Sequence, residues 1–173
     1  MATSPIIIAP DPRLNQVSEP ISSIEEGKRI IDAMLQLEKT TQCSGLAAIQ
    51  IGIPKRAFIL NISSYVPENT KMHVFINPKI TYFSDDKWAA EEGCLSLPVG
   101  RVPVERPENI KVNFIDYDGK EVELQASGWF ARGIQHELDH LNGITLFDHI
   151  ISKLKKDIYM RKLNKYKKSN NIK

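Results

Sequence analysis

Two features are scarce in this sequence, and each scarcity excludes a class of protein. Only two cysteines, Cys43 and Cys94, occur in 173 residues, too few for the disulfide framework of a small secreted domain. No apolar run approaches the roughly 18 residues that a membrane-spanning helix needs. The N-terminus has no basic segment before its apolar run, which Pro10 interrupts, so it does not predict a signal peptide. A cytoplasmic protein with reduced thiols is the simplest interpretation, although the sequence leaves one disulfide open, and we expect a single domain over residues 1–173.

Acidic residues are scarce near the C-terminus alone. Residues 153–173 hold nine Lys or Arg and one acid, Asp157, a net charge of +8, whereas the other 152 residues sum to −6. Such a tail is typical of proteins that bind a polyanion such as RNA. A solvated helix that aids solubility has the same composition, so the charge alone leaves both interpretations open.

Hydrophobic periodicity predicts an α+β fold. Residues 21–40 read as a helix, in which Ser23 and Glu26 form a capping box. Residues 40–54 are rich in small side chains and are expected to form a loop or turn. Strands are expected over 56–62 and 72–83, followed by a hairpin over 108–127 with Asp118 and Gly119 at its turn.

Two more helices are predicted after the hairpin. The first runs from about Gly128 to Asn142, with Gly143 as the residue that ends it. Its apolar stripe consists of Phe130, Ile134, Leu138 and Leu141. The second spans roughly 150–166, and its apolar residues are expected to face inward: Ile151, Leu154, Ile158 and Leu163. This order of elements favours antiparallel or mixed sheets around a central helix, with a basic helix at the C-terminus.

The segment 133–143, GIQHELDHLNG, carries the strongest chemical pattern in the chain. On a helix, His136 and His140 lie one turn apart on one face, so two imidazoles can reach one cation. Glu137 is rotated off that pair, yet it is close enough to reach a metal-bound water. Two histidines with Glu in this slot form a zinc-hydrolase signature, although a surface or core histidine pair is the alternative.

A catalytic metal needs a third protein ligand, and the two common protease patterns do not supply it. The metzincin pattern requires a histidine where this chain has Leu146, and the gluzincin pattern requires a later Glu, which is absent after residue 137. Other acceptors downstream stand at spacings that match no known pattern: Asp148, His149 and Asp157. The third ligand is therefore expected upstream.

Cys94, in the segment EEGCLSLP, is the upstream candidate, 42 residues before His136. A thiolate is a strong ligand for divalent transition metals. Gly93 permits a close approach of the backbone, and Pro98 is expected to end the segment. An isolated cysteine is otherwise a small buried apolar residue, and the missing ligand favours the metal interpretation.

Three segments together resemble the signature motifs of one enzyme family. GLAAIQIG (45–52), EGCLS (92–96) and QHELDHL (135–141) are similar, in order and separation, to those of peptide deformylase of the bacterial type with a helical C-terminus. The resemblance runs from DPRL (11–14) to the basic tail.

The resemblance implies a metal site and a reaction. It implies one divalent ion held by Cys94, His136 and His140, with Fe(II) as the physiological metal and Zn(II), Ni(II) or Co(II) also suited to these donors. The family removes the formyl group from the N-terminal formyl-methionine of new polypeptides. By this comparison, metal-bound hydroxide attacks the formyl carbon, and Glu137 acts as general acid and base. Gln50 and the Leu95 backbone N–H match the groups that stabilise the oxyanion.

Substrate contacts are also implied by the resemblance. The family holds its peptide as an added strand, which here would lie along Ser44, Gly45 and Leu46. Trp129 resembles a residue that lines the methionine pocket, although a plain core aromatic is an equal alternative. Arg101 falls near the cleft mouth, where an exposed Arg needs no function. The chain departs from the family at Cys43 and Ser44, where Gly and an apolar residue are usual, which puts the shape of the cleft in doubt.

Partners follow from the same comparison. Formyl-methionyl nascent peptides are the expected substrates, and the basic tail is expected to dock on ribosomal RNA through phosphate contacts. No DNA or membrane partner is expected. Two alternatives stay open. One is a metallopeptidase that cuts internal bonds with a third ligand other than Cys94. The other is a non-enzymatic RNA- or ribosome-binding module.

Overall fold

The structure is a computed structural model that describes residues 6–63 and 71–172. Residues 1–5 of the N-terminal segment and Lys173 of the basic tail lie outside the described residues. The elements, in chain order, are η1 (Pro12–Asn15), α1 (Ile24–Thr41), β1 (Gly45–Ala47), η2 (Ala48–Ile51), β2 (Ala57–Leu60), β3 (His73–Phe83), β4 (Lys87–Cys94), β5 (Leu97–Pro107), β6 (Asn109–Ile115), β7 (Glu121–Ser127), α2 (Gly128–Leu141) and α3 (Lys153–Ser169).

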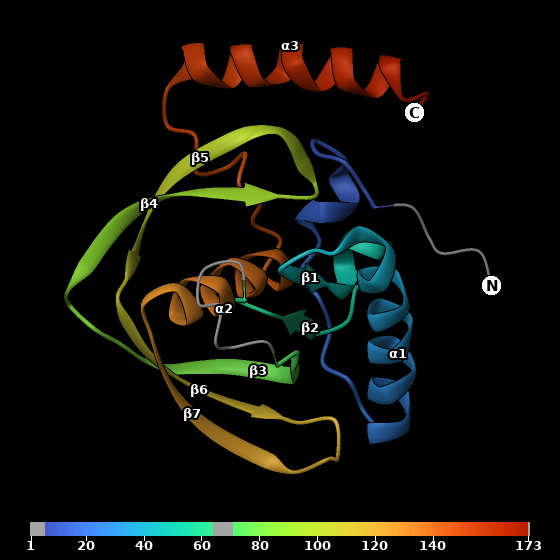
Figure 1. The fold of residues 1–173 in the computed structure, drawn as a ribbon, viewed down its shortest axis with the longest axis vertical. Coiled ribbons are helices and arrows are strands. Elements are labelled where there is room, and N and C mark those ends of the chain that lie inside the picture. The colour runs from blue at the N-terminus through green and yellow to red at the C-terminus, as the bar shows by residue number, and fades with distance from the viewer. Residues whose placement is uncertain (1–5, 64–70, 173) are drawn as a thin grey trace.

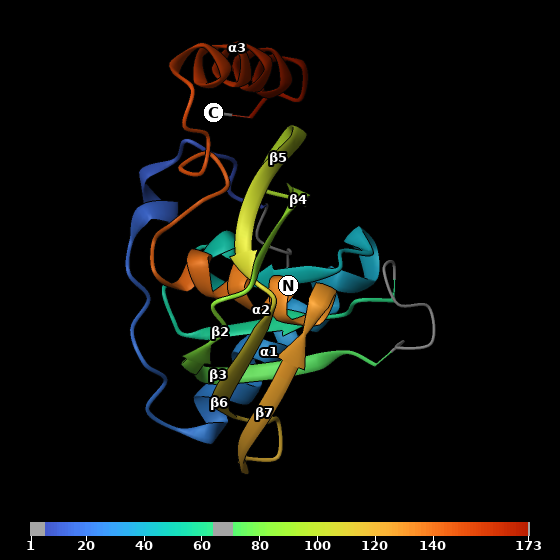
Figure 2. The same ribbon diagram turned by 90° about the vertical axis from the view of Figure 1, so that its left-hand side faces the viewer.

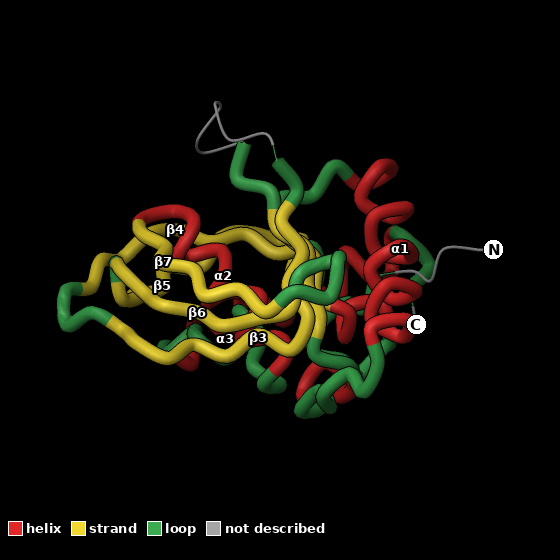
Figure 3. Tube along the Cα trace, turned by 90° about the horizontal axis from the view of Figure 1, so that it is seen from below, coloured by secondary structure: helices red, strands yellow, loops and turns green. Residues whose placement is uncertain are grey.

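Helix α2 lies at the centre of the fold, with strands around it (Figures 1 and 3). Five antiparallel strands form one sheet in the order β1-β2-β3-β6-β7, while β4 and β5 form a separate two-stranded sheet. The predicted α+β fold with a central helix is therefore confirmed. None of the helices in the described ranges is long and apolar enough to span a membrane.

Both faces of the five-stranded sheet are covered by helices. Successive residues of a strand point to opposite faces, and in β2 they belong to different core clusters. Phe58 packs in the cluster that contains Ile134 of α2, whereas Ile59 packs in the cluster that contains Met34 of α1. All four residues of β2 are buried, as a strand between two covering layers requires. This packing fixes α2 against the inner face of the sheet.

Local signals in the sequence are realised at α1 and at the β6–β7 hairpin. The Ser23 hydroxyl accepts the Glu26 N–H at 3.2 Å, but the Glu26 carboxylate accepts from Ser22 rather than Ser23, so the expected capping box is only half formed. In the hairpin, seven consecutive pairs run from Asn109↔Ser127 to Ile115↔Glu121. The turn between them contains Gly119 at φ +86°, as the Asp-Gly pair predicts.

Two regions differ from the expected elements. The segment expected as a loop contains β1 and η2. The three residues of β1 all pair with β2, but they are too few to give an alternating pattern in the sequence. The β4–β5 hairpin had no predicted counterpart. Its strands carry Pro98, Pro103 and Pro107, which weaken a strand signal but are tolerated in a two-stranded sheet, where each strand has an edge. Pro98 therefore lies inside β5 and does not end the Cys94 segment.

The prediction for the inward face of the last helix was wrong. Ile151, Leu154 and Ile158 are 99%, 68% and 41% exposed, and of the predicted set Leu163 alone is buried. The inward face consists of Tyr159, Leu163 and Tyr166, which recur at helical spacing. Ile158 and Leu163 are five residues apart and so point in different directions on a helix. Helix α3 stands at one end of the molecule, beyond the β4–β5 hairpin (Figures 1 and 2).

Candidate active site

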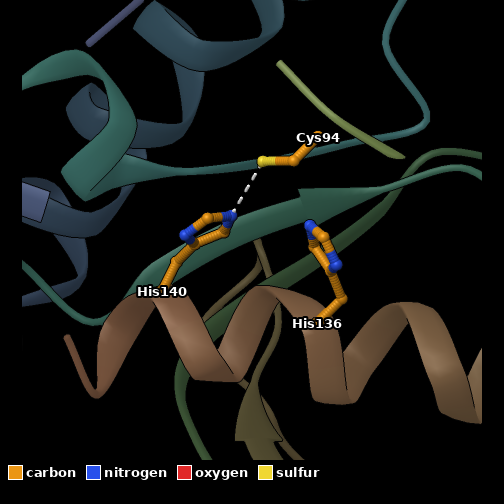
Figure 4. A group of neighbouring side chains, drawn as sticks. All are labelled: Cys94, His136 and His140. Atoms are coloured by element: carbon orange, nitrogen blue, oxygen red, sulfur yellow. Dashed lines mark hydrogen bonds between the residues drawn. The ribbon is translucent and has the colours of Figure 1, made fainter. Parts of the chain in front are cut away.

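Helix α2 brings its two histidines to face Cys94, the last residue of β4 (Figure 4). The Cys94 Sγ lies 3.2 Å from the His140 Nε2. One ligand atom from each of Cys94, His136 and His140 lies within 4.8 Å of the others. A thiolate and two imidazoles in one cluster fit a single divalent transition metal, with room for a further ligand. Both cysteines are free thiols, so the disulfide that the sequence left open is not formed.

The charges within this cluster favour the ligand form of the thiol. Burial raises the pKa of Cys94, but the two imidazoles outweigh that effect and hold the pKa well below its ordinary value. Burial lowers the pKa of His136, but Cys94 and Glu92 outweigh it and raise that pKa well above its ordinary value. The thiolate is the state of cysteine that binds metal.

Glu92 orients His136 from behind. Its carboxylate lies 2.9 Å from the His136 Nδ1, which leaves Nε2 to face Cys94. The same carboxylate accepts from Arg106 at 2.7 and 2.9 Å and from Arg132 at 2.6 Å. Arg106 in turn pairs with Asp139 at 2.8 Å. A carboxylate behind a histidine ligand fixes its tautomer and ring direction.

Glu92 was not predicted from the sequence. In the segment EEGC it stands beside Glu91, and nothing in the local pattern separates the two. In the structure Glu91 is exposed, whereas Glu92 is 5% exposed among two arginines and a histidine. Its position two residues before Cys94 was the one available signal.

Glu137 faces the same cavity as the metal-ligand candidates. Its side chain is buried, and burial raises its pKa to about 7 even though His136 and His140 act in the opposite direction. Gly45 of β1 lies directly against it, because a Cβ at that position would collide with the Glu137 Oε1. The carboxylate is therefore confined between α2 and β1, with a pKa suited to proton transfer near neutral pH.

Gln50 is held with its amide N–H groups toward the thiolate. Its Oε1 accepts the Ala47 N–H at 2.8 Å, which fixes the direction of the amide. Its Nε2 lies 3.1 Å from the Ser96 Oγ and 3.4 Å from the Cys94 Sγ. Leu95 follows Cys94 in the turn between β4 and β5 and also lines the cavity. Ser96 was not singled out in the sequence.

A cavity of about 260 Å³ is lined by Gln50, Cys94, Leu95, His136 and Glu137, whereas His140 is buried beside it. Its lining includes most of the substrate-binding residues expected from the sequence: Ser44, Gly45, Arg101 and Trp129. Cys43 also lines it. Leu46 does not, because its side chain is fully buried in the core beneath β1. The Trp129 ring meets Trp88 edge-on, with centroids 4.9 Å apart.

The fold and this donor set define a metal-dependent hydrolase of the His-Glu-x-x-His type. A family model described as polypeptide deformylase matches residues 3–156. The peptide deformylase of Rhizobium meliloti (strain 1021) is 44% identical over 174 residues, which cover 100% of this chain and 99% of that protein. The chain belongs to the polypeptide deformylase family, a family of enzymes, and the resemblance in its three motifs is confirmed.

Solved structures agree with the sequence relatives. The crystal structure of the peptide deformylase from Ehrlichia chaffeensis superposes with a TM-score of 0.88 at 34% identity, covering 96% of this chain and 98% of that one. A second structure from Ehrlichia chaffeensis, in complex with actinonin, gives a TM-score of 0.86 at 35% identity, with 98% of each chain covered. The likeness therefore extends over almost the whole chain.

Proposed function

We propose that this chain removes the formyl group from the N-terminal formyl-methionine of newly synthesised polypeptides. The observation that carries the proposal is the group of metal-ligand candidates Cys94, His136 and His140, whose ligand atoms lie within 4.8 Å of one another. Glu137 and Gln50 line the same cavity. The names of its full-length relatives support this substrate.

Cys94, His136 and His140 would hold one divalent cation. Fe(II) is the proposed physiological ion, and Zn(II), Ni(II) and Co(II) suit the same donors. The ion would supply Lewis acidity and lower the pKa of water. The Glu92 carboxylate keeps the His136 Nε2 directed at the site.

Glu137 carries the proton in the proposed reaction. With its pKa near 7, its carboxylate takes a proton from the attacking water as the new C–O bond forms at the formyl carbon. It then passes that proton to the amine nitrogen as the C–N bond breaks, which releases formate and a free amino terminus. The Gln50 amide and the Leu95 backbone N–H donate to the formyl oxygen as charge develops there.

The peptide would bind as an added strand on β1. This strand ends the sheet, and among the described strands it pairs with β2 alone. Ser44 and Gly45 line the cavity, so the substrate backbone would lie beside Ser44, Gly45 and Leu46. Trp129 would form a wall of the methionine pocket, and Arg101 would stand at its mouth.

Formate release from formyl-Met-Ala-Ser, measured together with metal content on protein purified without oxygen, tests the proposal. Cys94→Ser should lose bound metal and reduce kcat/KM by roughly a hundredfold or more, because a ligand and the Lewis acid go together. Cys43→Ser, the only other thiol, should keep its metal. Wild-type protein that releases no formate, or Cys94→Ser protein with full metal and full activity, would contradict the proposal.

We also infer that α3 docks on ribosomal RNA. The family model ends at residue 156, so most of this helix lies beyond the matched residues. The helix stands at one end of the molecule (Figure 2), and its Arg161, Lys165 and Lys168 are exposed. Phosphate contacts of this kind are sequence-independent and weaken steeply with salt.

Substitutions that remove positive charge test the docking better than deletion of the helix, because deletion would also remove the buried Leu163. Changing Arg161, Lys165 and Lys168 to Gln should lower ribosome affinity roughly tenfold and flatten its salt dependence. The same change at the exposed residues Lys79, Lys87 and Lys120 is the control. Equal ribosome binding by both triple variants would contradict the inference.

A further inference from the structure

A second cavity, of about 580 Å³, lies between β5 and α3, and we call it the α3 groove. Its apolar lining consists of Val102, Pro103, Ile150, Ile151, Ile158 and Tyr159. The Tyr159 hydroxyl donates a hydrogen bond to the Arg101 carbonyl, which ties α3 to β5. The groove is therefore formed by the fold itself.

The α3 groove begins where the cleft of the candidate active site ends. Arg101 lines both cavities. Its guanidinium lies 3.5 Å from the Glu91 carbonyl, and Glu91 also lines the groove. Arg101 therefore borders both cavities and marks a path from one to the other.

The surface chemistry of the α3 groove suits a polypeptide. Ile151 and Ile158 are 99% and 41% exposed. A ligand that removes this apolar surface from water would gain binding free energy. The charged residues in its lining are Glu91, Arg101 and Lys155, so charges of both signs border a mostly apolar surface, as a polypeptide requires. The basic residues that suit RNA, such as Arg161 and Lys165, are absent from its lining.

The distance is short enough for one peptide to occupy both cavities. The β4–β5 hairpin lies between α2, which carries His136, and α3 (Figures 1 and 2), and two strands are about 10 Å wide. An extended chain covers about 3.3 Å per residue, so about three residues cross the hairpin. If the formyl-methionine is counted as the first position, residues from about the fourth to the seventh position of the peptide would then lie in the groove.

We propose that the α3 groove binds apolar side chains of the formylated polypeptide, downstream of the residues held in the cleft. This inference rests on the proposed deformylation. It makes the region around Ile151 and Ile158 a determinant of substrate preference, separate from the metal ligands and from the RNA-facing lysines. Burial of one or two apolar side chains in an open groove should raise kcat/KM roughly three- to tenfold, mainly through KM.

Three formylated peptides test the groove on metal-loaded enzyme: Met-Ala-Ser, and two seven-residue peptides that extend it with four residues. One extension is Leu-rich and the other consists of Gly and Ser. Wild-type enzyme should favour the Leu-rich peptide. Ile158→Ser and Ile151→Ser should abolish that preference and leave turnover of the three-residue peptide unchanged. Leu154→Ser is the matched control, because Leu154 is 68% exposed and lies outside the groove lining.

The outcomes distinguish failure of the groove inference from failure of the proposed deformylation. If the wild type turns over the three-residue peptide but treats both extensions alike, the groove inference is overturned. It is also overturned if the preference survives both groove substitutions, or if Leu154→Ser abolishes it equally. Loss of ribosome binding by Ile151→Ser with the peptide preference intact would assign the surface to the ribosome instead. Failure to deformylate any peptide would count against the proposed function. Ile151 is 99% exposed, so its substitution tests the groove without unfolding the protein.

Discussion

Gly45 matters because of the side chain that it lacks. It is the first residue of β1 and pairs with Leu60, and its Cα faces the Glu137 carboxylate so closely that a Cβ would overlap Oε1. The position of Glu137 relative to the metal-ligand candidates therefore depends on a residue 92 positions earlier in the chain. A shift of about 1 Å in a reacting group can cost about a hundredfold in rate.

Gly45→Ala should therefore lower kcat by roughly tenfold to a hundredfold, because Glu137 must move away from its place beside the ligands. Steady-state formate release measures the effect. Gly93→Ala is the control within the same cavity, since its Cβ would meet nothing nearer than the Arg101 Cγ at 3.9 Å. Equal kcat values for the two variants would show that Glu137 is not confined by Gly45.

The Glu92 carboxylate contacts two arginines and His136 at once. Glu92→Gln keeps its shape but removes the carboxylate partner of the buried Arg132 and leaves the buried Arg106 with Asp139 alone. Removal of one partner from a buried ion pair costs about 3–5 kcal/mol, and loss of the carboxylate behind a histidine ligand lowers metal affinity about 10- to 100-fold. Urea unfolding and competitive metal titration measure the two effects.

Glu91→Gln is the matched control for Glu92→Gln, because this neighbour is exposed. Its substitution should change the free energy of unfolding by less than about 0.5 kcal/mol. A Glu92→Gln protein with wild-type stability and metal affinity would contradict the supporting role of the Glu92 carboxylate.

At the scale of elements, the start of α1 offers a local test. The Ser23 hydroxyl satisfies the Glu26 N–H at 3.2 Å. Ser23→Ala should lower the free energy of unfolding by about 1 kcal/mol, whereas Ser23→Gly should cost only a few tenths of that. The urea midpoint at constant m-value measures both. If Ser23→Ala is as stable as the wild type, the cap hydrogen bond contributes nothing.

Elements with a strong period of their own were predictable. Helices α1 and α2 and the β6–β7 hairpin follow from local pattern, because each buries a stripe or one face at regular spacing. Strand β1 was missed because its three residues carry no measurable period, and β4 and β5 because prolines and charges obscure theirs. The inward face of α3 was misjudged because the apolar residues before Ile158 and those after it lie on different faces.

At the scale of the whole molecule, the titration of His73 should contribute to the pH dependence of the free energy of unfolding. Burial, with a smaller effect from Lys71, lowers the pKa of His73 below 6.5. Its Nε2 is buried without a hydrogen-bond partner among the described residues, and its ring lies 4.7 Å from that of Phe130. The unfolded chain therefore binds a proton that the folded chain resists, and stability is lost as pH falls below 6.5.

His73→Phe should remove that loss. The difference in free energy of unfolding between variant and wild type should shift in favour of the variant as pH falls from about 7.5 to 5, by no more than about 1.4 kcal/mol per pH unit. Chemical denaturation at several pH values measures it, and other titrating groups cancel in the difference. A difference that stays constant with pH would show that His73 titrates normally in the folded protein.

The sequence by itself determined the family, the two histidines and Glu137 on one helix, and Cys94 as the candidate that completes the ligands. The two histidines and Glu137 follow from spacing within one helix, which local geometry converts directly into position, whereas the family and Cys94 follow from three motifs and their order along the chain. The tertiary structure alone decided that Glu92 rather than Glu91 supports His136, that Gly45 confines Glu137, and that Ile151 and Ile158 line a groove instead of a core. Each of these depends on which distant segments of the chain come into contact and exclude water. The hydrophobic periodicity of a single element carries no information about such contacts.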